Sequence, residues 1–197
     1  GGVLMAFHPL PVLLNECLDG LLIRPDGDYL DCTLGGGGHS AAILYELEGG
    51  SLTGIDRDAD AIAAATARIT DPRFHALRGN FHDARELTGD AKFDGILADL
   101  GVSSHQLDVR ERGFSYHDGA PLDMRMDADQ PVTAADIVNT RSEDELNRIF
   151  RDYGEEKWAR QIARVICDRR KSTPIETTSQ LVDLIDASIP KKFREKD

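Results

Sequence analysis

The chain has 197 residues, of which 41% are hydrophobic and 29% are charged, proportions that are typical of a soluble globular protein and exclude a disordered one. Its length allows one complete hydrophobic core with a smaller inserted domain. Three cysteines lie far apart, without the clusters of a disulfide framework or a zinc site, which indicates a reducing, cytoplasmic setting. Residues 1–7 have neither a basic stretch nor a long apolar run, so we expect no signal peptide and no membrane association.

The net charge of −12 argues at first against a nucleic-acid partner, but the charges are unevenly distributed. Residues 1–140 contain 10 Lys and Arg against 23 Asp and Glu, whereas residues 141–197 contain 13 against 12. An acidic first part followed by a much more basic second part permits an RNA-binding face on the second part. The composition does not require one.

Four short apolar-rich runs in the first hundred residues, each bounded by turn residues, predict β-strands. These runs are 29–33, 51–56, 74–77 and 93–100. Apolar residues recur at helical spacing over 39–47, and again over a helix that Asp58 caps and that runs through Ile69. Alternating strands and helices are typical of right-handed βαβ units, so the sequence predicts a doubly wound α/β core with a parallel sheet.

The pattern changes after residue 100. Residues 101–129 form a long polar stretch without a sustained period, which is typical of a functional loop or a disordered segment. Helix start signals follow at Thr133, at the capping box Ser142-x-x-Glu145 and at Thr177-x-x-Gln180. We therefore predict two domains, a cofactor-binding core over 1–104 and a loop plus mostly helical substrate-recognition domain over 105–197.

The glycine run Gly35 to Gly38 follows the first predicted strand and opens a predicted helix. Glycine amides at such a turn let a ligand approach the backbone closely. Asp56 ends the second predicted strand about 20 residues further on, where a carboxylate accepts hydrogen bonds from ribose hydroxyls. Together they favour a site for a nucleoside-containing ligand over a plain structural turn.

The identity of that ligand is open between two cofactors. Gly36-x-Gly38-x-x-Ala41 also satisfies the dinucleotide fingerprint, which keeps an NAD-dependent oxidoreductase as an alternative. Asp31 and Asp99, which lie toward the ends of the first and fourth predicted strands, place carboxylates around the same crevice. Carboxylates suit the sulfonium cation of S-adenosylmethionine better than a pyrophosphate.

Asp99 has a second interpretation, as a catalytic residue. The exocyclic amine of cytosine is a poor nucleophile because its lone pair is delocalised into the ring. A carboxylate that accepts its protons favours attack on a sulfonium methyl group. The alternative is an aspartate that caps the next segment, but its position at the end of a strand favours a functional role.

Several longer motifs occur in one order along the chain: Asp31-x-Thr33-x-Gly35-x-Gly-Gly-His39, Asp99-Leu-Gly-Val-Ser-Ser-x-Gln106-Leu-Asp108, Arg112-Gly-Phe-Ser115, Pro121-Leu-Asp-Met-Arg-Met-Asp127 and Tyr153-Gly-Glu-Glu156. With them the chain resembles the RsmH (MraW) methyltransferase family along its whole length. The resemblance implies an S-adenosylmethionine-dependent enzyme that methylates N4 of a cytidine in the decoding region of bacterial 16S rRNA. It also implies a Rossmann-like methyltransferase core with an inserted helical domain.

The resemblance further implies which residues contact the cofactor: Gly37, Gly38, His39, Asp56, Phe81, Asp99 and Gln106. Phe81 would pack near the adenine ring. Without the family resemblance, we would interpret Phe81 as a core residue and His39 as a residue at a helix N-terminus. Gln106 would be an ordinary amide side chain in a loop. Residues 123–126 would belong to a lid over the target base.

The expected partner is 16S rRNA or the small ribosomal subunit, and a homodimer is left open. Basic residues on the later helices suit either phosphate contact or a solvated face: Arg160, Arg164, Arg169, Arg170 and Lys171. Two departures from the family stand out. Gly36 occupies a position where the family often has Arg, and the chain stops at Asp197, whereas family members continue through strands that complete the sheet. We therefore expect the C-terminal strands of the core to be absent, and a non-catalytic RNA-binding module that keeps the cofactor pocket is a further alternative.

Overall fold

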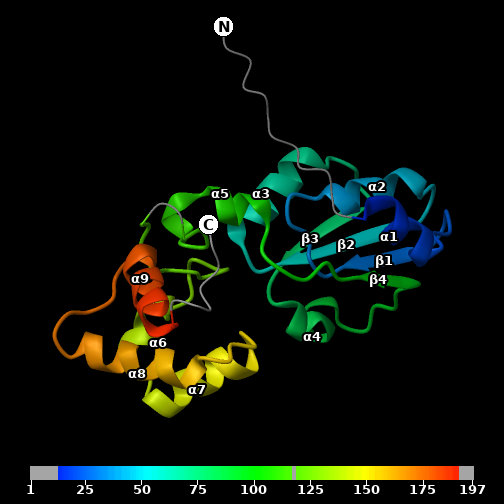
Figure 1. Ribbon diagram of the computed structural model, residues 1–197. Helices are drawn as coiled ribbons and strands as arrows, with labels where there is room; N and C mark the ends of the chain where they lie inside the picture. The colour runs from blue at the N-terminus through cyan, green and yellow to red at the C-terminus, as the bar shows by residue number, and fades with distance from the viewer. Residues whose placement is uncertain (1–12, 117–118, 191–197) are drawn as a thin grey trace, which may run out of the picture. The chain divides into compact units, whose positions relative to one another are not determined.

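The computed structural model describes residues 13–116 and 119–190 of the chain (Figure 1). The chain divides into two compact units, residues 1–103 and residues 104–197. Each unit has its own hydrophobic core.

The first unit is an α/β fold around a four-stranded parallel sheet (Figure 1). Its elements are α1 (Leu14–Leu21), β1 (Asp28–Asp31), α2 (Gly38–Glu46), β2 (Ser51–Asp56), α3 (Ala59–Arg68), β3 (Phe74–Arg78), η1 (Phe81–Asp83), α4 (Ala84–Thr88) and β4 (Gly95–Leu97). The strand order is β3-β2-β1-β4. The order reverses at β1, which is the arrangement of a doubly wound fold and confirms the predicted class.

Buried side chains from the strands and from α2 form the core of this unit. Its most deeply buried members are Tyr29, Ile43, Leu44, Leu47, Leu52 and Ile69. Asp58 caps α3 as predicted, because its carboxylate accepts a hydrogen bond from the amide of Asp60 at 3.1 Å. These elements bring the carboxyl ends of the four strands to one edge of the sheet.

The fourth strand is shorter than the sequence predicted. β4 covers Gly95–Leu97, not 93–100. Leu97 pairs with Asp31, which is the last residue of β1. Beyond Leu97, β4 therefore has no strand to pair with on that side. An apolar run alone does not show where the neighbouring strand stops.

The second unit is mostly helical, as predicted. Its elements are α5 (Ser104–Asp108), η2 (Arg110–Arg112), α6 (Ala134–Thr140), α7 (Glu143–Asp152), α8 (Ala159–Arg170) and α9 (Thr178–Ser188). Capping boxes start α6, α7 and α9, with Thr133, Ser142 and Thr177 as the N-caps. The core comprises Leu122, Val138, Leu146, Ile162, Ala163, Ile166 and Ile175. Among the described residues, no helix combines the length and the apolar character needed to cross a membrane.

The stretch 101–129, which the sequence predicted as a long loop, contains the short helices α5 and η2. Both are short and polar, so they carry no apolar periodicity that sequence inspection detects. Pro121 also forms an antiparallel bridge with Thr177. This bridge joins the stretch to the start of α9.

Candidate cofactor site at the carboxyl ends of the strands

The glycine run forms a tight turn between β1 and α2. The amide of Leu34 donates to the carbonyl of Ile55 at 3.0 Å, and the amide of Gly37 donates to the carbonyl of Leu34 at 2.8 Å. Gly37 has a φ of 76°, and a Cβ built there lies 3.0 Å from Ile69 Cδ1. The turn therefore requires glycine at this position both for its backbone conformation and for its approach to α3.

Gly36 differs from Gly37 because its position faces open space, with no atom within 4 Å of a Cβ built there. Gly37 is the N-cap of α2 and makes no side-chain hydrogen bond to the amides of the first turn. Uncapped amides and the positive end of the helix dipole suit an anionic group such as a carboxylate. Gly38 begins this turn, and His39 beside it is buried.

Asp56, at the end of β2, holds the turn in place. Its Oδ2 accepts a hydrogen bond from the amide of Gly35 at 2.8 Å, and its Oδ1 accepts one from the amide of Asp58 at 2.9 Å. A carboxylate offers about four acceptor positions, so each oxygen keeps capacity for a hydroxyl donor. The half-buried Asp56 thus joins the glycine turn to β2 and still has room for ribose contacts.

Asp31 lies elsewhere than the sequence led us to expect. Only 1% of its surface is exposed, and it does not line an open crevice. Its carboxylate accepts hydrogen bonds from Ser40 Oγ at 2.7 Å and from the amide of Thr33 at 3.1 Å. Burial raises the pKa of this carboxyl group, since removal from water disfavours its charged form. Asp31 is therefore part of the interior that supports the turn.

Asp99 lies beyond the end of β4 and is exposed. Its amide donates a hydrogen bond to Thr33 Oγ1 at 2.6 Å, across from the end of β1. Sequence reasoning selected Asp99 but assigned no role to Thr33 or Ser40. The signal for Thr33 was its place in the motif Asp31-x-Thr33, two residues after a strand end.

Phe81 begins η1, shortly after β3. The side chain of Asn80 caps this short helix by accepting from the amide of His82 at 3.0 Å. Phe81 is 46% exposed, which contradicts its reading as a core residue and leaves its ring accessible to a ligand. Glycine turn, Asp56, Phe81 and Asp99 thus all lie at or just after the carboxyl ends of strands in one sheet.

Gln106 belongs to the second unit, where it lies in α5 and is 7% exposed. Its assignment to the cofactor site remains a prediction. The predicted lid is tightly braced within this unit. Arg125 forms a two-pronged ion pair with Asp123, and Arg112 Nη2 donates to the carbonyls of Arg125 and Met126. Met124, which directly precedes Arg125 in the sequence, has a φ of 59°.

The basic residues of α8 divide into two groups. Arg170 donates to the carbonyl of Val138 at 2.8 Å, and Lys171 pairs with Asp168 at 2.8 Å. Arg160 and Arg164 are exposed and line one shallow groove, and no ion pair or hydrogen bond to either is found among the described residues. Among the described residues, Arg160 and Arg164 are thus exposed cations of α8 that carry no ion pair or hydrogen bond and can contact an outside partner.

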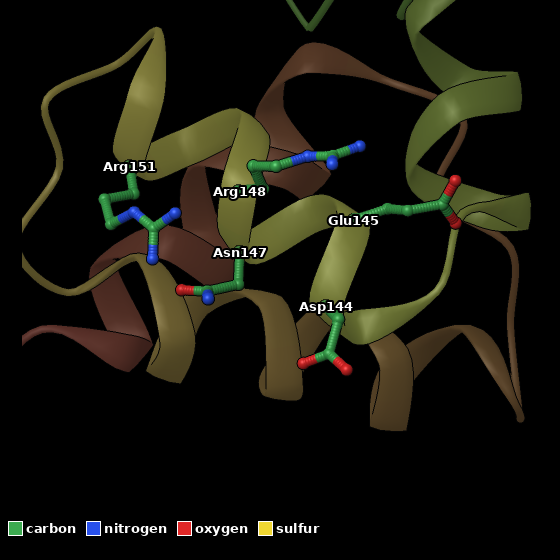
Figure 2. A pocket seen from close by; sticks show the side chains of 5 residues that line it. All are labelled: Asp144, Glu145, Asn147, Arg148 and Arg151. Carbon is green, nitrogen blue, oxygen red and sulfur yellow. The ribbon is translucent and has the colours of Figure 1, made fainter.

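A second groove lies on α7. Its lining residues are Asp144, Glu145, Asn147, Arg148 and Arg151. Figure 2 shows these side chains fanning out from α7 in different directions, so they do not converge on a common point. The acidic and basic groups also offset each other in charge. This groove has no arrangement that selects a ligand.

Known proteins resemble this chain closely in sequence. Residues 6–197 match the model of the MraW methylase family. Ribosomal RNA small subunit methyltransferase H of Clostridioides difficile is 51% identical over 196 residues, covering 96% of this chain and 63% of that protein. The protein of the same name from Symbiobacterium thermophilum is 50% identical over 198 residues, covering 98% of this chain and 62% of that protein.

The chain thus spans less than two thirds of the length of these curated relatives. A solved structure from Clostridium thermocellum superposes with a TM-score of 0.41 at 20% identity, covering 50% of this chain and 58% of that one. The family match extends over nearly all of the chain, from residue 6 to residue 197. The chain belongs to the MraW methylase family.

Proposed function

We propose that this chain carries the cofactor site of an S-adenosylmethionine-dependent methyltransferase that acts on N4 of a cytidine in the decoding region of bacterial 16S rRNA. The observation that carries the proposal is the convergence of the glycine turn, Asp56 and Asp99 on one edge of a parallel sheet. In α/β folds, ligands bind outside the carboxyl ends of the strands at the point where the strand order reverses. The family membership and the names of the relatives support the same activity.

The residues present fit each part of this cofactor. The start of α2, where Gly37 and Gly38 leave the amides of the first turn without a side-chain cap, suits its carboxylate. Asp56 keeps acceptor capacity for ribose hydroxyls, and the exposed ring of Phe81 offers a surface for adenine. His39 and Gln106 complete the contacts that we assign to this site.

The proposed chemistry is an in-line displacement in which orientation supplies most of the rate enhancement. The cofactor supplies an electrophilic methyl group when it is bound. We assign to Asp99 the acceptance of a proton from the N4 amine, which raises the electron density available for attack. The exposure of Asp99 suits contact with a base that has left its stack. No step requires a metal ion or a covalent intermediate.

The proposed macromolecular partner is 16S rRNA or the small ribosomal subunit. Arg160 and Arg164 lie one helical turn apart on α8, and both are exposed. Cations in that arrangement suit contacts with successive phosphates. Residues 123–126 are the proposed lid over the target base, as the family resemblance implies, and Arg112 and Arg125 brace their backbone.

Two measurements test the proposal. Isothermal titration calorimetry, on this chain and on the protein at the full length of its relatives, compares S-adenosylmethionine with NAD. We expect binding of the first only, and binding of NAD alone would favour an oxidoreductase. Mass mapping then locates labelled methyl groups on 16S rRNA after incubation with the full-length protein and cofactor. An unmodified cytidine N4, despite bound cofactor, would overturn the substrate assignment and favour a non-catalytic RNA-binding module.

A further inference from the structure

The hydroxyl group of Thr33 connects two strand ends where the backbone ladder stops. The last residue pair between β1 and β4 is Asp31 with Leu97, followed by a hydrogen bond from the amide of Cys32 to the carbonyl of Leu97 at 2.8 Å. Thr33 and Asp99 each lie two residues beyond the pair Asp31–Leu97, and Thr33 Oγ1 accepts a hydrogen bond from the amide of Asp99 at 2.6 Å. A side chain therefore continues the connection between the two strands.

The buried Asp31 orients this hydroxyl group. Thr33 Oγ1 lies 3.5 Å from Asp31 Oδ1, and the same carboxylate oxygen accepts the amide of Thr33 at 3.1 Å. The amide of Asp99 can only donate, so Thr33 Oγ1 accepts there, and its own proton is left for an acceptor such as Asp31 Oδ1. Ser40 Oγ fixes the other carboxylate oxygen at 2.7 Å. The acceptor for Asp99 is thus held by a chain of groups that extends into the interior.

The position of Asp99 depends strongly on this one contact. Asp99 is exposed, its neighbours Ala98 and Leu100 are exposed as well, and no described residue donates to its carboxylate. Gly101, two residues further on, has a φ of 146°, a backbone conformation that favours glycine. Packing and side-chain contacts therefore contribute little to the placement of the Asp99 carboxylate.

We propose that Thr33 is a positioning residue for Asp99, which sets where its carboxylate meets the target amine. This inference rests on the proposed function, because it gives Asp99 its role in methyl transfer. Thr33 itself needs no contact with cofactor or substrate. A displacement of about 1 Å at a reacting group costs on the order of a hundredfold in rate, so loss of the hydroxyl acts on turnover more than on cofactor binding.

The test compares the wild type with Thr33→Val and Thr33→Ser at the full length of the relatives. Valine keeps the shape of threonine without the hydroxyl group, and serine keeps the hydroxyl group. The readouts are hydrogen exchange at the Asp99 amide, the Kd for S-adenosylmethionine by calorimetry, and kcat and KM for methyl transfer to 16S rRNA. We expect Thr33→Val to exchange the Asp99 amide roughly tenfold faster, and Thr33→Ser to restore its protection.

In turnover, we expect Thr33→Val to lower kcat at least about tenfold with little change in the cofactor Kd, and Thr33→Ser to recover most of that loss. Wild-type kcat in Thr33→Val, or wild-type protection of its Asp99 amide, would overturn the inference. An equal loss in both variants, together with a lower melting temperature, would also overturn it in favour of a purely structural role. A wild-type protein that transfers no methyl group overturns the proposed function, while amide exchange still reports the Thr33–Asp99 contact separately.

Discussion

Asp31 and Asp56 end neighbouring strands, yet the protein uses their carboxylates in different ways. Asp31 is buried and satisfied by Ser40 and Thr33, so it supports the turn from within. Asp56 is half-buried and holds the amide of Gly35 while it keeps acceptor capacity. The residue type alone predicted a strand-end acid in both positions, but only the packing of α2 distinguishes the two roles.

The raised pKa of Asp31 predicts a pH-dependent effect of Asp31→Asn. Because its folded-state pKa lies above the ordinary value of 3.8, the contribution of Asp31 to stability is fully present below that pH. It is lost as the pH rises through the folded-state pKa. We therefore expect the free energy of unfolding of the variant, relative to wild type, to improve between about pH 4 and neutrality. Urea unfolding at a series of pH values measures this difference.

Asp71→Asn is the matched control, with the opposite sign. The side chain of Arg73 lowers the pKa of Asp71 to about 2. The contribution of Asp71 to stability is present above its unfolded-state pKa and is lost as the pH falls through about 2, so its removal costs stability near neutrality. A difference between Asp31→Asn and wild type that does not vary with pH would contradict the prediction.

The two central glycines of the turn predict a contrast between alanine substitutions. Gly37→Ala puts a Cβ on a residue with a φ of 76° and within 3.2 Å of Ala65 Cβ. We expect it to lower the free energy of unfolding by about 1–2 kcal/mol and to weaken S-adenosylmethionine binding. Gly36→Ala faces open space and serves as the control, with stability close to wild type. Thermal denaturation and calorimetry decide between them, and equal effects at both positions would contradict the geometry.

Among the elements, α2 depends on Arg73, which directly precedes β3 and donates hydrogen bonds to carbonyls at the end of α2. Its guanidinium donates to the carbonyl of Leu47, to the carbonyl of Leu44 at 3.2 Å, and to Asp71 Oδ2 at 2.7 Å. The last carbonyls of a helix need such donors. A planar fork satisfies several acceptors at once, which an ammonium group does not reproduce.

Arg73→Lys is therefore expected to lower the melting temperature of the protein by a few degrees, although the charge is kept. Arg85→Lys in α4 is the control, because Arg85 is exposed and makes no ion pair or hydrogen bond among the described residues. Differential scanning fluorimetry measures both variants. If both variants have the melting temperature of the wild type, the guanidinium of Arg73 does not stabilise the end of α2.

Arg160 and Arg164 of α8, exposed and without an ion pair or hydrogen bond in the part of the chain that the structure describes, predict a change in RNA binding. Arg160→Ala with Arg164→Ala should weaken binding to 16S rRNA and reduce the slope of log affinity against log salt by roughly one to two. The double variant Arg169→Ala with Lys171→Ala removes the same charge from the last turn and C-cap of the same helix, but Lys171 is held by Asp168 and Arg169 by Ser172. Filter binding at several salt concentrations compares the pairs. An equal loss in both would indicate general electrostatics and not a phosphate-contacting face.

At the scale of the whole molecule, the parts of the fold that the sequence predicted are those set by local patterns. The strand Ser51–Asp56 and the capping boxes at Ser142 and Thr177 depend on residues within a few positions of one another. The length of β4, the burial of Asp31 and the exposure of Phe81 depend on distant partners. Sequence periodicity contains no information about where a partner strand ends.

The candidate site divides in the same way. The glycine turn and Asp56 were predictable because glycine tolerance and strand-end acids carry a chemical signature. Thr33 was not singled out, because one hydroxyl group among many has none until Asp99 is brought opposite it. The roles assigned to the site residues all stay predictions: Gly37, Gly38, His39, Asp56, Phe81, Asp99 and Gln106.

The pairing of β1 with β4 has a consequence for folding kinetics. The Thr33–Asp99 hydrogen bond joins residues 66 positions apart, whereas the helices of the second unit form from neighbouring segments with their own caps. Closing a long loop costs conformational entropy before the contact between its ends can stabilise the chain, so pairings between residues far apart in sequence form late. We therefore expect the Asp99 carboxylate, which is proposed to act on the target amine, to reach its position in one of the last steps of folding. A nascent or partly refolded molecule then forms its helices before its catalytic group is in place.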